Sequence, residues 1–112
     1  MKKNLVITIC VILIVIILAY VVLGLTKARP LTDSDIAKCI GKKSTLYVQL
    51  GCHACAAQED IFGDTYENLN VVDCFYDREK CGEIKVTPTW KINSDLIKGF
   101  QSIEKLRELT GC

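Results

Sequence analysis

The sequence predicts a small α/β sandwich preceded by one transmembrane helix, and three observations lead to this prediction. An uncharged apolar run fills residues 4–26. The rest of the chain alternates helix-like and strand-like segments, and a helix-length segment separates the first two strands, as in a parallel crossover. Six of the seven cysteines follow the apolar run and can cross-link a core of limited size. With 14 basic and 13 acidic residues, the charge balance gives no case for nucleic-acid binding.

The apolar segment is long enough to cross a bilayer. At 1.5 Å per residue, Leu5 to Leu25 extend about 30 Å, the thickness of the hydrocarbon core. A cleaved signal peptide is the alternative, since Lys2 and Lys3 form a positive start, but its apolar region normally has only about 7 to 15 residues. Pro30 disfavours helix at the residue before it. We therefore predict an uncleaved signal-anchor, a linker and a folded domain at 1–26, 27–32 and 33–112.

The distribution of cysteines orients the chain. Lys2 and Lys3 precede the apolar run and Lys27 and Arg29 follow it, so positive charge alone decides little. A high cysteine density is typical of domains kept in an oxidising compartment. The N-terminus is therefore predicted in the cytosol and the domain outside the cytoplasm or in a lumen.

Capping residues and periodicity predict the elements of the domain in order. Thr32 or Asp33 can cap a first helix that Gly41 ends, and Gly63 closes a second helix. Ser102 can cap the last helix. The predicted helices are 33–41, 52–62 and 102–111, the strands are 44–50, 70–76, 87–93 and 96–100, and 77–85 forms a short helical turn. The aromatic residues expected in the core are Tyr47, Phe62, Tyr66, Phe75 and Trp90.

The stretch Cys52-His53-Ala54-Cys55 lies where a strand gives way to a helix, and it can be a redox pair, half of a zinc site or a static bridge. A thiol is a good nucleophile only as thiolate, and the N–H groups at a helix start favour that anion. Cys52 would attack, and Cys55, one turn further, would resolve the mixed disulfide. The electrons would reside in this pair, so no bound cofactor is needed. His53 either stabilises the Cys52 thiolate as an imidazolium or is solvated without effect.

Zinc is the alternative use of the same sulfurs. Cys52, Cys55, Cys74 and Cys81 have the spacing C-x2-C-x18-C-x6-C, and four thiolates can form a tetrahedral site. The last spacing is wider than the two to four residues usual between paired zinc ligands. The interpretation that competes with catalysis is thus a non-catalytic adaptor domain stabilised by zinc or by disulfides.

The remaining cysteines have simpler alternatives. Cys39 lies on the inward face of the first predicted helix, as a buried free thiol or in a bridge to Cys112. Such a bridge would close a long loop and contribute on the order of 4 kcal/mol. Cys10 lies within the apolar run, where a small apolar residue fits.

Four stretches together resemble the thioredoxin-like domains associated with vitamin K epoxide reductase homologues. They are CHACAAQEDIFG, VVDCFYD with a following Cys, IKVTPTWKIN and SIEKLRELTGC, and the likeness covers Asp33 to Cys112. The resemblance implies a thioredoxin-like fold and thiol-disulfide oxidoreductase activity. It makes Cys52 the nucleophile, Cys55 the resolving cysteine and Pro88 a cis-proline facing them, with Thr87 offering backbone hydrogen bonds to a bound peptide.

The resemblance also implies partners. These are cysteine-containing protein substrates on one side and a quinone-linked membrane oxidase of the vitamin K epoxide reductase type on the other. A further cysteine pair belongs to the pattern, so Cys74 and Cys81 would form a structural disulfide or a second redox pair that relays electrons. Typical thioredoxins carry a buried acid on the strand before the motif, where this chain has Leu46. Its absence favours an oxidant or isomerase over a reductase.

Overall fold

The computed structural model describes residues 1–26 and 31–112. The chain divides into two compact units, Met1–Pro30 and Leu31–Cys112. Residues 27–30, the larger part of the predicted linker, lie outside the described residues, and so does the predicted effect of Pro30.

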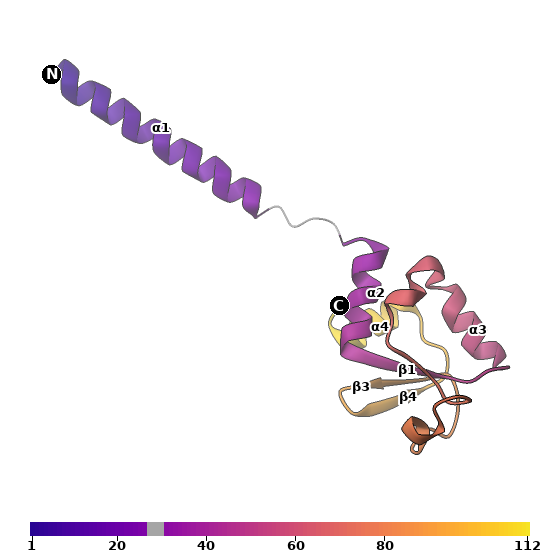
Figure 1. Cartoon of the computed structure of the whole chain (residues 1–112). Coiled ribbons are helices and arrows are strands. Elements are labelled where there is room, and N and C mark those ends of the chain that lie inside the picture. The colour runs from indigo at the N-terminus through magenta and orange to yellow at the C-terminus, as the bar shows by residue number, and fades with distance from the viewer. Residues whose placement is uncertain (27–30) are drawn as a thin grey trace. The chain divides into compact units, whose positions relative to one another are not determined.

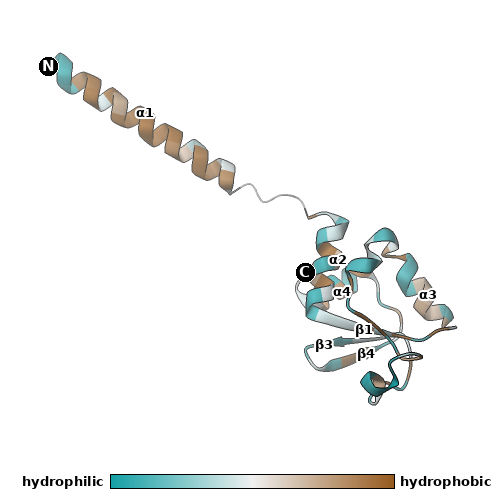
Figure 2. Ribbon diagram, viewed as in Figure 1, coloured by the Kyte–Doolittle hydropathy of each residue, from teal (hydrophilic) through white to brown (hydrophobic). Residues whose placement is uncertain are grey.

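The N-terminal unit is one helix, α1 (Lys2–Leu25), and none of its residues is buried. Figure 2 shows apolar residues along almost its whole length. The helix is long and apolar enough to cross a membrane. The apolar N-terminal helix is thus confirmed. A signal sequence meets the same test, so the uncleaved anchor stays a prediction.

The second unit is built on a four-stranded mixed sheet with the strand order β2-β1-β3-β4 (Figure 1). Strand β1 (Ser44–Val48) runs parallel to β2 (Val71–Asp73) and antiparallel to β3 (Thr89–Ile92). Strand β3 pairs with β4 (Asp95–Lys98) in an antiparallel hairpin. The predicted α/β class, with a parallel crossover between the first two strands, is confirmed.

The two-residue turn of this hairpin is Asn93-Ser94, and both residues have positive φ angles, 51° and 74°. This backbone geometry matches the right-handed twist of the strands that it joins. The turn joins the strands predicted at 87–93 and 96–100, which the structure bounds at Thr89–Ile92 and Asp95–Lys98.

Three helices contribute to one core on a single face of the sheet. They are α2 (Asp33–Lys43), α3 (His53–Asp60) and α4 (Ile103–Thr110), and Figure 1 shows them with the strands. Short 3-10 helices, η1 (Gly63–Asn68) and η2 (Arg78–Cys81), complete the unit. Alternation along the strands turns one set of side chains toward the helices. The core contains Ala37, Ile40, Leu46, Val48, Cys55, Phe62, Leu69, Trp90, Ile92 and Leu106.

Several predicted boundaries were wrong. Helix α2 continues through Gly41 to Lys43. A Cβ atom at Gly41 would collide with the backbone carbonyl of Asn68, so this glycine permits close packing against η1 and does not end the helix. Helix α3 stops at Asp60, and Gly63 begins η1. Both parallel strands are shorter than predicted.

The shorter β2 also changes the place of Phe75. The strand ends at Asp73, and a turn follows in which the Asp73 carboxylate accepts a hydrogen bond from the Phe75 backbone N–H at 2.9 Å. Phe75 was expected in the core but is 44% exposed. Its ring lies edge-on to that of Tyr76, 5.0 Å away between ring centroids.

Candidate functional site

The cysteine pair lies at the carboxyl end of the central strand β1. After Val48 the chain turns through Gly51, whose φ of 84° is readily adopted only by glycine. Cys52 is the N-cap residue of α3, and its sulfur accepts a hydrogen bond from the backbone N–H of Cys55 at 3.1 Å. The strand end, the turn and the helix start thus place this sulfur where unpaired backbone N–H groups gather.

Cys52 and Cys55 form a disulfide, with Cα atoms 5.2 Å apart. The two sulfurs differ in their surroundings. Cys52 is partly exposed, whereas Cys55 is only 7% exposed and belongs to the core. A thiolate from another molecule can therefore reach Cys52 far more easily than Cys55.

The segment before β3 faces Cys52. The Thr87–Pro88 peptide bond is cis, and the Thr87 carbonyl oxygen lies 3.6 Å from the Cys52 sulfur. In the disulfide that sulfur carries no proton, but a Cys52 thiol could donate to this carbonyl. Pro88 is buried, and its carbonyl oxygen accepts a hydrogen bond from the Gly99 N–H at 2.8 Å. The predicted substrate-contacting residues are thus held beside the cysteine pair.

A buried glutamine fixes α3 on the sheet, and the sequence analysis did not identify it. Gln58 is fully buried, and its Oε1 accepts hydrogen bonds from the Trp90 indole N–H at 3.1 Å and the Gln101 backbone N–H at 2.8 Å. Its Nε2 donates to the Gln101 carbonyl at 2.9 Å. The spacing of three residues from Cys55, along the buried helix face, was the available signal. Gln58 couples the position of the cysteine helix to β3.

A cavity of about 260 Å³ adjoins the disulfide. Both cysteines line it, together with three titratable side chains that come from three different elements: Glu59 of α3, Tyr66 of η1 and Asp73 of β2. Burial raises the pKa of Tyr66, and the negative charges of Glu59 and then Asp73 raise it further. The negative charges of Glu59 and Asp73 are therefore both felt by the Tyr66 phenol. The sequence analysis assigned no role to either carboxylate and expected Tyr66 in the core.

His53 is the first residue of α3 and is exposed. Its predicted effect on the Cys52 thiolate stays a prediction. Leu46 is fully buried on β1, and its side chain cannot accept a proton.

The other predicted cysteine pairs are present as disulfides. Cys74 and Cys81 bridge the turn after β2 and η2, with Cα atoms 5.7 Å apart. The Cys74 N–H donates to the Val48 carbonyl at 2.8 Å, so this bridged segment starts directly beside the end of β1. Whether it only supports the fold or also relays electrons stays a prediction.

The second bridge joins Cys39 of α2 to Cys112 after α4, with Cα atoms 6.0 Å apart. Cys10 of α1 is a free cysteine. The four cysteines considered as zinc ligands all form disulfides in this structure, Cys52 with Cys55 and Cys74 with Cys81. Within the parts of the chain that the structure describes, no three His, Cys, Asp or Glu side chains are placed to hold a metal ion together.

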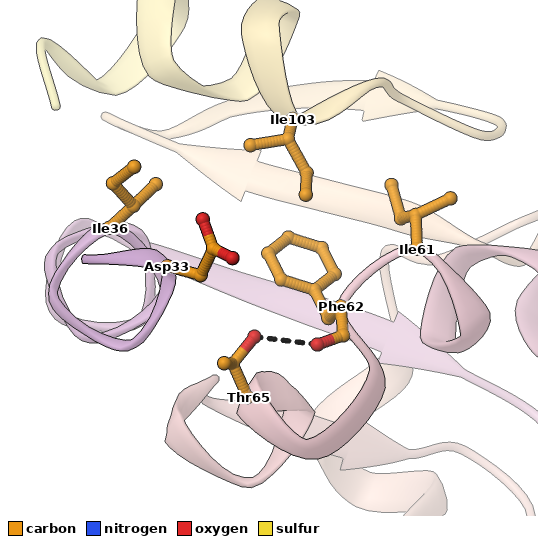
Figure 3. Close-up of a pocket in the computed structure, with 6 residues that line it drawn as sticks. All are labelled: Asp33, Ile36, Ile61, Phe62, Thr65 and Ile103. Carbon is orange, nitrogen blue, oxygen red and sulfur yellow. Dashed lines mark hydrogen bonds between the residues drawn. The ribbon is translucent and has the colours of Figure 1, made fainter.

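Another cavity, of about 160 Å³, lies between α2, the end of α3 and the start of α4 (Figure 3). Apolar side chains of Ile36, Phe62 and Ile103 point into it, and the Thr65 hydroxyl donates to the Phe62 carbonyl at 2.7 Å. Among the described residues that line it, Asp33 is the one that carries a charge. None of the described residues that line this cavity is a cysteine, so it offers packing space and no sulfur for disulfide exchange.

Comparison with known proteins finds no family model that matches the chain and no curated protein that matches it.

Proposed function

We propose that the unit Leu31–Cys112 is a thiol-disulfide oxidoreductase that exchanges disulfides with protein thiols through Cys52 and Cys55. The observation that carries the proposal is the difference in exposure between the two cysteines at the start of α3. The accessible sulfur of Cys52 accepts a hydrogen bond from a backbone N–H and is bonded to the buried sulfur of Cys55. The same N–H would stabilise negative charge on Cys52 whenever the pair opens. A static bridge needs neither the exposure nor the donor.

The reaction proceeds by two sulfur displacements. A substrate thiolate attacks the Cys52 sulfur, the Cys52–Cys55 bond breaks, and Cys55 leaves with the electron pair. A second substrate thiolate then attacks the substrate sulfur of the mixed disulfide, and Cys52 leaves. The substrate gains a disulfide, and the cysteine pair gains two electrons and two protons. The Thr87 carbonyl beside Cys52 is placed to accept a hydrogen bond from the backbone of the bound peptide.

The strand order supports a thioredoxin-like sandwich as the finer description of the fold. A parallel β1–β2 pair, followed by the antiparallel β3–β4 hairpin and a covering helix, agrees with the fold that the sequence resemblance implies. The cysteine pair at the β1–α3 junction and the cis peptide bond before Pro88 support the same description. Residues 33–112 would form this domain.

We further propose that α1 tethers the domain, with the N-terminus in the cytosol and the domain extracytoplasmic or lumenal. Three disulfides in the second unit favour an oxidising compartment. The partners are cysteine-containing polypeptides and a membrane oxidase of the vitamin K epoxide reductase type, which would accept electrons from the Cys52/Cys55 pair. The pair is thus proposed to act as oxidant or isomerase, and a potential as reducing as that of thioredoxin, about −270 mV, would contradict this direction.

Trapping tests the proposal directly. Cys55→Ala leaves Cys52 without its resolving partner, so substrates should accumulate on it as mixed disulfides that dithiothreitol releases and mass spectrometry identifies. The matched control is Cys81→Ala, which also frees one cysteine but leaves the Cys52/Cys55 pair intact. If Cys55→Ala traps no polypeptide beyond this control, the oxidoreductase proposal fails. One tightly held zinc per chain, with Cys52 inert to alkylation, would support the adaptor instead.

A further inference from the structure

Proton transfer at Cys55 is a chemical requirement of the proposed function. Cys55 alternates between thiol and thiolate each time the pair opens or closes, and it is only 7% exposed. A buried sulfur that gains or loses a proton needs a base within reach, directly or through one water. The strand beneath it offers none, because Leu46 is apolar and fully buried.

The neighbouring strand β2 supplies an acid two residues beyond the level of Leu46. Asp73 is the last residue of β2 and pairs in register with Val48, the last residue of β1. Val71, two residues earlier, packs against the core, and side chains two apart in a strand point to the same face. Asp73 therefore projects toward the helix-covered face, where it lines the same cavity as Cys55.

We propose that Asp73 is the proton acceptor and donor for Cys55. This inference rests on the proposed disulfide exchange and adds the residue that manages its proton. When the pair closes, the Asp73 carboxylate takes the Cys55 proton, the Cys55 thiolate attacks Cys52, and the substrate leaves as thiolate from the mixed disulfide. When the pair opens, Cys55 leaves as thiolate and the protonated Asp73 returns the proton. The same residue serves both directions because the two processes are microscopic reverses.

The other groups around the cavity have different roles. Glu59 lies four residues after Cys55 on α3 but is exposed, so it is solvated and contributes mainly its charge. Tyr66 of η1 remains protonated at neutral pH, because burial and the two carboxylates raise its pKa. A neutral phenol beside two carboxylates can donate a hydrogen bond but cannot take the Cys55 proton. Of the carboxylates of Glu59 and Asp73, which both line the cavity, that of Asp73 is the less exposed. Asp73 is therefore the group best placed to exchange a proton with Cys55.

The structure permits a substitution that removes titration and keeps the turn. The Asp73 carboxylate accepts the Phe75 N–H, and the amide oxygen of Asn can do the same, so Asp73→Asn preserves this contact. Asp60→Asn is the matched control, because Asp60 is exposed at the end of α3 and does not line the cavity. Glu59→Gln tests the second carboxylate.

The experiment measures the two sulfur steps separately in the full chain. It uses detergent, a Cys10→Ser background, and one equivalent of dithiothreitol, with alkylation mapping to verify that only Cys52 and Cys55 are open. Reaction with 5,5′-dithiobis(2-nitrobenzoate) then releases thionitrobenzoate in two phases: attack by Cys52, and resolution by Cys55. Asp73→Asn should slow only the second phase near neutral pH, by roughly 100-fold as for loss of a general base, and make its rate proportional to hydroxide.

The outcomes separate the inference from the function on which it rests. If Asp73→Asn and Asp60→Asn have the same second phase and pH profile, the proton role is wrong although disulfide exchange stands. Equal slowing of both phases by Asp73→Asn would indicate a structural effect and also overturn it, as would a larger second-phase loss in Glu59→Gln. If the unsubstituted pair shows neither phase, the proposed function itself fails.

Discussion

Of the three disulfides, Cys39–Cys112 should contribute most to the free energy of unfolding. The double substitution Cys39→Ala with Cys112→Ala removes this bridge and tests the prediction. The bridge spans 73 residues, for which the chain-entropy relation gives about 4.4 kcal/mol at 25 °C. The Cys74–Cys81 bridge spans 7 residues, and the same relation gives about 2.4 kcal/mol. The long bridge is thus expected to contribute about 2 kcal/mol more, a large share of the 5 to 15 kcal/mol typical of a domain.

Urea unfolding of the full chain in non-ionic detergent measures the difference. Trp90 is the only tryptophan and is 1% exposed, so its fluorescence follows loss of the core. The matched comparison is Cys74→Ala with Cys81→Ala, which also removes two cysteines and one bridge. Equal losses of unfolding free energy in the two double variants, or a loss below about 1 kcal/mol for the long bridge, would refute the loop-length reasoning.

Three further predictions concern packing and titration. Gly41→Ala puts a Cβ atom against the Asn68 carbonyl and should lower the unfolding free energy by about 1–3 kcal/mol in urea titrations, although Ala favours helix. Gln58→Leu strands the Trp90 indole N–H and should cost about 1–3 kcal/mol for each buried group left unpaired, with a shifted Trp90 emission; an unchanged melt and spectrum would contradict the hydrogen-bond account. Burial and neighbouring carboxylates raise the pKa of Tyr66 above 10.0, so its native state holds the proton more tightly than the unfolded chain. That contribution is complete below pH 10.0 and is lost as pH rises through the native pKa; Tyr66→Phe should abolish this alkaline loss in unfolding measured across a pH series.

Local chemistry explains the parts of the fold that the sequence predicted well. Ser102 caps α4 by accepting the Lys105 N–H, and Gly111 ends that helix in the left-handed conformation, as expected of these residue types. The hairpin turn and the placement of Cys52 at a strand-to-helix junction also depend on neighbours within a few residues. Such features can be read from short stretches of chain.

Features that depend on distant contacts could not be read in this way. Gly41 resembles a helix end until the approach of Asn68 is known, and that approach joins α2 to η1. Phe75 is an aromatic residue of the kind that is common in strands, but β2 ends two residues before it. Asp73 looked like one acid among thirteen, and only the register of β2 against β1 brings it to the cavity beside Cys55.

The central position of β1 also governs how the domain would transmit mechanical force. The shorter covalent path from α2 to Cys52 passes through β1 and the turn after it, since α2 leads directly into that strand. The Cys39–Cys112 disulfide adds a longer covalent path through the rest of the domain. A polypeptide bonded to Cys52 and pulled away from the N-terminal helix would therefore load β1 along its length. Because β2 and β3 flank this strand on both sides, two hydrogen-bonded ladders would have to shear together before it moved. The Cys39–Cys112 disulfide would share the load with the longer path, which includes α4 and the β3–β4 hairpin.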